Sequence, residues 1–124
     1  MDEIKPLRWT GSSKDDLSAM PVEVRRHVGY ALYAAQKGGK HDDAKVLKGF
    51  GDAGVIEVIS RFDGDTFRAV YTVRFAGAVY VLHAFQKKAK RGIATPKTEI
   101  DLIHKRLKLA EEDYRQWSAT GSHT

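Results

Sequence analysis

Three apolar runs with very short links between them restrict the possible folds of this chain more than any other feature of its sequence. The runs occupy residues 55–62, 66–75 and 78–85, and the links are "DGD" at 63–65 and "AG" at 76–77. Short links that contain glycine are typical of hairpin turns. Because such turns connect antiparallel neighbours, the sequence predicts a three-stranded antiparallel meander.

The segment before the meander predicts one more strand and two helices. Residues 4–9 alternate between apolar and polar side chains, as a strand does. Two serines followed by two aspartates open a short helix that ends near residue 19. A longer helix over residues 21–36 carries one apolar stripe, and the polar, Gly-rich segment 40–54 is predicted to be a long connection.

The segment after the meander predicts a long amphipathic helix. Thr95 is expected to cap it, Pro96 to lie in its first turn, and apolar residues recur three or four apart as far as Trp117. We therefore predict a single domain over residues 1–117 and a flexible polar tail over 118–124.

Together these elements predict an α+β domain in the order strand, helix, helix, three strands, helix. The first two helices are expected to cover one face of the sheet. The last helix is expected to pack beside the sheet or across its edge. Part of the second face would then stay open to a partner.

Composition limits the class of partner and the compartment. The 124 residues suit one domain, and the formal net charge of +5 favours a polyanionic partner such as nucleic acid. The chain has no cysteine, which excludes disulfides and thiolate metal sites, and no apolar run long enough to cross a bilayer. The acidic start "MDEIKPLRW" also lacks the apolar core of a signal peptide. We therefore expect a cytoplasmic protein with no membrane partner.

Strand alternation predicts where the basic residues of the meander meet. Arg68 and Arg74 share one face of the middle strand, which is expected to be the exposed face. Val81, His83, Phe85 and Lys87 are expected to share a face of the third strand. Because that strand folds back on the middle one, its basic end should reach the region of Arg68.

Such a cluster suits a phosphodiester. Arginine and lysine bind phosphate oxygens, and they stabilise the charge that develops when phosphorus is attacked. A histidine such as His83 can transfer a proton near neutral pH, and an aromatic ring such as Phe85 can stack on an unpaired base. Other interpretations stay open: Arg68 pairs with Glu57, His83 is a hydrogen-bonded core residue, Phe85 is core, and the run "KKAKR" is a solvated surface. Tyr71, on the apolar face of the middle strand, is expected to be core.

Other chemistries find no support in the pattern. The five histidines show no HxxxH or HxH spacing, so no metal site is expected. The glycines of "GFGDAG" at 49–54 precede a strand instead of joining a strand to a helix, so they are not a dinucleotide fingerprint. No P-loop and no GxSxG motif is present.

Several motifs resemble one family. The pieces "FRAVY" at 67–71, "VLHAFQKK" at 81–88 and "TPKTEIDLI" at 95–103 are similar to the RelE/ParE superfamily. The similarity is to its phage-derived branch, close to the HigB toxins of type II toxin–antitoxin systems. This resemblance implies a RelE-like fold with a twisted four-stranded antiparallel sheet, two N-terminal helices and a C-terminal helix.

The resemblance also implies an activity and its residues. A toxin of this kind would cleave mRNA on the translating 70S ribosome without metal or cofactor, through attack of a ribose 2′-OH on the adjacent phosphate. A cognate helix-turn-helix antitoxin would block it. The catalytic positions would fall on Arg68, His83, Lys87 and Lys88. Further RNA contacts are expected from Arg74, Phe85, Lys90 and Arg91.

The resemblance leaves two other functions open. A ParE-like toxin would keep the fold but poison DNA gyrase. A phage-derived protein could also bind nucleic acid without cleaving it. The basic run after the last strand argues for the ribonuclease, and no general base is visible beside it.

Overall fold

The predicted meander forms the centre of the fold. A computed structural model describes residues 4–87 and 95–120 of the chain. The elements follow in the order β1 (Leu7–Trp9), α1 (Ser13–Ser18), α2 (Val22–Gln36), β2 (Ala44–Val46), β3 (Val55–Phe62), β4 (Asp65–Thr72), β5 (Val79–Lys87) and α3 (Lys97–Ala119). β3 and β4 are joined at Asp63 and Gly64, which both have positive φ, as a tight hairpin with right-handed strand twist requires.

The sheet has one strand more than predicted, and it is mixed. The strands of the described ranges form one sheet in the order β1-β5-β4-β3-β2, with β1 parallel to β5 and the other pairs antiparallel. β1 can be parallel to β5 because two helices and three strands separate them, so no tight turn imposes an antiparallel direction. The sequence did not predict β2, because only Ala44 of its three residues is buried and alternation has no room to appear.

A bulge in β5 changes which residues share a face. Val70 lies opposite His83 and Tyr71 lies opposite Val81, so Leu82 is an extra residue in β5. Leu82 belongs to the core beneath α3, and His83 contacts the same helix. Strict alternation, by contrast, predicted Val81 and His83 on one face. That prediction is wrong, because the bulge turns Val81 toward α2.

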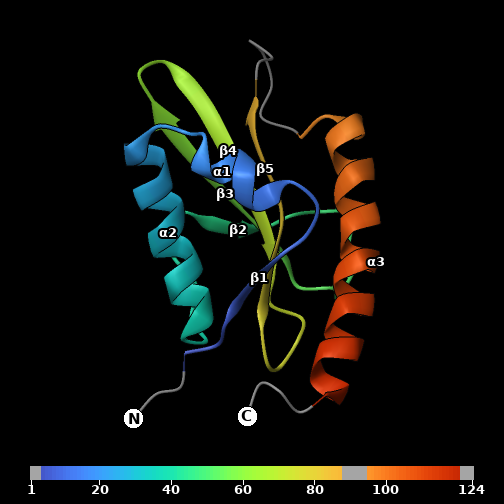
Figure 1. Ribbon diagram of the computed structural model, residues 1–124. Coiled ribbons are helices and arrows are strands. Elements are labelled where there is room, and N and C mark those ends of the chain that lie inside the picture. The colour runs from blue at the N-terminus through green and yellow to red at the C-terminus, as the bar shows by residue number, and fades with distance from the viewer. Residues whose placement is uncertain (1–3, 88–94, 121–124) are drawn as a thin grey trace.

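The helices cover both faces of the sheet (Figure 1). α2 lies on one side and α3 on the other, and a separate apolar core fills each of the two layers. The expectation that α3 packs beside the sheet or across its edge is therefore wrong. Ile103, Leu107 and Ala110 of α3 are buried against this face, because the apolar stripe of the helix matches the apolar residues of β4 and β5.

The start and end of α3 differ slightly from the prediction. Pro96 is the N-cap residue and no side chain caps the helix, so Thr95 does not have the predicted capping role. The helix continues to Ala119, beyond Trp117. No helix in the described part of the chain is long and apolar enough to cross a membrane.

Candidate active site on the α3 face of the sheet

Arg68 is buried at the centre of a polar network. Its side chain is 2% exposed, so the expectation that its face is open to solvent is wrong. Nη1 donates to Glu57 Oε1 at 3.1 Å and to Thr95 Oγ1 at 3.2 Å, and the Thr95 hydroxyl donates to Glu57 Oε2 at 2.8 Å. The alternative that Arg68 pairs with Glu57 is thus confirmed. Because buried charges need partners, this network ties β3 and β4 to the start of α3.

The basic end of β5 does reach the region of Arg68, as predicted. Arg68 lies opposite Phe85, and Lys87 lies opposite Thr66. Lys87 is 9% exposed. Burial, and then the nearby charge of Arg68, hold the pKa of Lys87 below its ordinary value, while Glu57 acts in the opposite direction. A lysine in such surroundings gives up its proton more readily than a solvated one.

His83 is fixed between two charged residues of α3. Its Nδ1 lies 3.2 Å from Arg106 Nη1, and its Nε2 lies 3.0 Å from Glu99 Oε2. A guanidinium can only donate, so Nδ1 must accept its hydrogen bond. The ring proton is therefore on Nε2, which donates a hydrogen bond to Glu99. Burial first, and also the charge of Arg106, hold the pKa of His83 below its ordinary value, against the opposite effect of Glu99. The structure therefore holds His83 as one neutral tautomer.

Arg106 is itself positioned by the bulge and by the loop after β1. It is buried and donates to the Leu82 carbonyl at 3.1 Å and to Ser12 Oγ at 3.2 Å. Gly11 lies against it with φ of +52°, and a Cβ at this position would come within 2.7 Å of the guanidinium Nε. Gly11 therefore permits a close approach that no other residue type allows.

An open pocket of about 660 Å³ lies beside the His83–Glu99 pair. Its polar lining includes the carboxylates of Asp16, Asp65 and Glu99. Phe85 also lines it and stacks on the His83 ring, with ring centroids 4.7 Å apart and planes 19° from parallel. The pocket thus combines an aromatic surface with acceptors of hydrogen bonds.

The structure brings some predicted residues together and separates one. His83, Phe85 and Lys87 follow each other along β5, near Arg68. Arg74 lies past the other end of β4, roughly 20 Å along the strand from Arg68. It forms an ion pair with Glu111 and does not join the cluster. The predicted site residues Lys88, Lys90 and Arg91 lie outside the described residues.

Sequence reasoning missed two residues of the site, Glu99 and Arg106. Both lie on α3, and they face His83 only because α3 covers the sheet. Glu99 is part of the segment "TPKTEIDLI", but no spacing within that segment connects it with a histidine sixteen residues earlier. Tyr71, by contrast, is core as predicted; burial raises its pKa to about 12.

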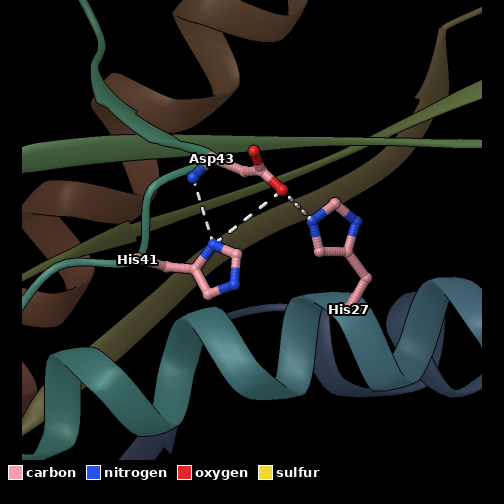
Figure 2. A group of neighbouring side chains, drawn as sticks. All are labelled: His27, His41 and Asp43. Atoms are coloured by element: carbon pink, nitrogen blue, oxygen red, sulfur yellow. Dashed lines mark hydrogen bonds and ion pairs between the residues drawn. The ribbon is translucent and has the colours of Figure 1, made fainter.

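A second group of histidines was also missed. His27 of α2 and His41 and Asp43 of the turn before β2 offer ligand atoms that all lie within 4.8 Å of one another (Figure 2). The expectation of no metal site considered only spacings between histidines that are close in sequence. It could not detect a pair that the packing of a helix against a loop brings together.

Comparisons with known proteins identify the family. The chain belongs to the Phage derived protein Gp49-like family (DUF891), whose model matches residues 15–108. This is a RelE-like toxin family, so the resemblance to the RelE/ParE superfamily is confirmed. A comparison with curated proteins finds no match.

Two solved structures are similar to the fold. One is a mutant of the Escherichia coli toxin RelE in the free state, with a TM-score of 0.52 and 16% identity over 70% of this chain and 87% of that one. It shows that the α+β fold is RelE-like. The other is the RelBE2 toxin–antitoxin complex of Mycobacterium tuberculosis, with a TM-score of 0.46 and 18% identity over 72% of this chain and 98% of that one.

Proposed function

We propose that this chain is the toxin of a type II toxin–antitoxin pair, and that it cleaves mRNA on the translating 70S ribosome without metal or cofactor. The observation that carries the proposal is the order of groups along β5. The His83–Glu99 pair, the Phe85 ring and Lys87 follow one another above the buried charge of Arg68. Membership of a RelE-like toxin family supports the class of function.

The pocket suits the base of a nucleotide better than its phosphate. Its three carboxylates repel phosphate, but they can accept hydrogen bonds from base amino and imino groups. Phe85 supplies a surface on which a base can stack. We therefore expect one nucleobase to enter the pocket from single-stranded RNA.

The scissile phosphate is expected at the basic end of β5. Lys87 begins the run "KKAKR", and its charge would stabilise the phosphorane together with Lys88. Lys90 and Arg91 would bind the flanking phosphates. Arg68 would act from below, where its charge adds to burial in keeping the pKa of Lys87 low, and it would not touch RNA itself.

Glu99 is the best candidate for the general base. Its carboxylate lines the pocket, and the hydrogen bond that it accepts from His83 Nε2 orients it. It would take the proton of the 2′-OH while the 2′-oxygen attacks phosphorus and the bond to the 5′-oxygen breaks. Lys87 would give a proton to that leaving oxygen. The products would be a 2′,3′-cyclic phosphate and a 5′-hydroxyl, and His83 would position Glu99 rather than transfer a proton.

Induction of the protein in a bacterial host, followed by primer extension on mRNA, tests the proposal. The unaltered chain should arrest growth and cleave mRNA. Glu99→Gln and the double variant Lys87→Ala/Lys88→Ala should each lose cleavage by about 100-fold or more, because each removes a proton-transfer group. Lys97→Ala, an exposed change on the first turn of α3, is the matched control and should cleave normally.

Three outcomes would contradict the proposal. Full cleavage by the double lysine variant would show that the site is wrong. Intact mRNA together with inhibited supercoiling by gyrase would indicate a ParE-like toxin. Harmless expression with intact RNA would indicate a nucleic-acid-binding protein that has no activity.

We further propose a small helix-turn-helix antitoxin as the partner, since a cytoplasmic toxin of this superfamily requires one. The family resemblance supports this partner. Co-expression of a neighbouring gene of that kind should restore growth, and the two proteins should purify together. If the neighbour neither restores growth nor binds, it is not the antitoxin.

A further inference from the structure

We propose that His27, His41 and Asp43 form a binding site for one divalent transition-metal ion of the zinc class. The three side chains come from α2 and from the turn that leads into β2, and they point toward one another (Figure 2). Asp43 Oδ2 lies 2.7 Å from His27 Nε2 and 3.9 Å from His41 Nδ1. No part of the proposed RNA cleavage uses these residues.

The spacing of the donor atoms suits a small cation after slight adjustment. Zinc binds imidazole nitrogen and carboxylate oxygen at about 2.0–2.2 Å, so neighbouring ligand atoms in a tetrahedral site lie about 3.3 Å apart. The observed separations lie on both sides of that value, and all three atoms lie within 4.8 Å of one another. Small side-chain rotations are enough, since all three side chains are partly exposed.

A hydrogen bond fixes the tautomer of His41 that a metal ion at Nδ1 requires. The backbone N–H of Asp43 donates to His41 Nδ1 at 3.1 Å, so Nδ1 accepts and the proton of the neutral ring is on Nε2. The N–H of Ala44 donates to the His41 carbonyl at 2.9 Å and closes the same turn. The lone pair of Nδ1 points at this N–H, and Asp43 Oδ2 lies 3.9 Å from the same nitrogen, so a shared cation would replace the N–H as the partner of Nδ1.

The buried Ser60 hydroxyl orients His27 from β3. Ser60 Oγ lies 2.7 Å from His27 Nδ1. A hydroxyl can donate or accept, so it permits either ring tautomer. Without a metal, Nε2 faces Asp43 Oδ2 at 2.7 Å and carries the proton, because a carboxylate only accepts. When a metal ion replaces that proton, the ring can hold its proton on Nδ1, where Ser60 accepts the hydrogen bond and Nε2 binds the metal. A histidine ligand commonly has such an oxygen partner on its second nitrogen.

The donor set favours a transition metal over magnesium or calcium. Two imidazoles and one carboxylate suit zinc, cobalt, nickel or copper, whereas the hard alkaline-earth ions prefer oxygen ligands alone. The partial exposure of the three side chains leaves room for water as a fourth ligand. The ion would join α2 to the turn before β2, which is one of the two outer strands in the described sheet. His83, in contrast, faces α3 on the other side of the sheet.

Titration of the full-length, chelator-treated protein tests the site. Calorimetry with Zn²⁺ should give one ion per chain with a dissociation constant below about 10 μM. Co²⁺ should produce visible absorption bands of a tetrahedral site. Saturating Zn²⁺ should also raise the melting temperature by a few degrees, because the ion binds only the folded chain.

Single substitutions assign the ligands. His27→Gln, His41→Gln and Asp43→Asn should each weaken Zn²⁺ binding at least about 30-fold, and Ser60→Ala about tenfold. His104→Gln, which changes an exposed histidine of α3, is the matched control and should bind normally. Circular dichroism checks that each variant is folded, and the exposed Asp43 is the change least able to disturb the fold.

The proposal is overturned if the unaltered protein binds Zn²⁺ with a dissociation constant above about 10 μM, or if Asp43→Asn binds as well as the control. Both results are independent of RNA cleavage. Cleavage assays with a chelator present separate the two proposals, because loss of the ion should leave the α3 face intact.

Discussion

His83 and His27 both contact a carboxylate, but their second ring nitrogens meet different partners. Arg106 donates to Nδ1 of His83, and a hydroxyl, that of Ser60, faces Nδ1 of His27. The guanidinium permits only one neutral tautomer of His83, whereas the hydroxyl lets the proton of His27 move to Nδ1 when a metal ion replaces it on Nε2. The same residue type is thus a fixed orienting group in one layer and an adaptable ligand in the other. The hydrogen-bond partner of Nδ1 therefore decides which role each histidine can have.

The largest expected effect comes from removing the group that fixes His83. Arg106→Ala should lower the free energy of unfolding by about 3 kcal/mol, because buried acceptors on His83 and Leu82 lose a charged donor. Urea denaturation measures this. Lys105→Ala, an exposed neighbour on α3, should change stability by less than about 0.5 kcal/mol. Equal losses in the two variants would show that Arg106 does not fix the site.

A smaller loss is expected from crowding the same guanidinium. Gly11→Ala should cost about 2 kcal/mol, because alanine is strained at a φ of +52° and its Cβ would meet Arg106. Gly29→Ala is the control, since the added methyl group has open space within α2 and should stabilise the protein slightly. Thermal melts compare the two. A neutral Gly11→Ala change would mean that Arg106 can move away from His83.

The smallest expected effect is a dependence of stability on pH. The pKa of His83 is lower in the folded chain than in the unfolded one, so the unfolded chain binds its proton first as the pH falls. The contribution of His83 to the free energy of unfolding should therefore be fully present above about pH 6.5 and be lost as the pH falls through the pKa of the folded state. His83→Gln should show a weaker decrease between pH 7.5 and 5.5 in denaturation experiments. An unchanged decrease would show that His83 is not held neutral.

Much of the fold was predictable because it depends on local pattern. Tight turns and alternating apolar residues predicted the meander, and three-and-four spacing predicted α2 and α3. The bulge at Leu82, the short β2 and the parallel pairing of β1 were not predictable. Each of these depends on how segments distant in sequence meet, and no single segment carries a signal for it.

The candidate site, like the fold, could be predicted from the sequence only in part. The sequence placed Arg68 near the basic end of β5, because antiparallel pairing follows from a short turn. It did not show that α3 covers this face, so it assigned Arg68 to solvent and missed Glu99 and Arg106. The catalytic roles of these residues and the boundary of the domain stay predictions.

The sequence alone determined the α+β class, the meander and the family. These depend on short-range periodicity and on motifs that are contiguous along the chain. Only the tertiary structure decided that His83 is held between Glu99 and Arg106, and that His27 meets His41 and Asp43. The physical reason is that a side chain's ionisation and ligands depend on atoms within a few ångströms of it. In this fold those atoms come from elements that are far apart in sequence.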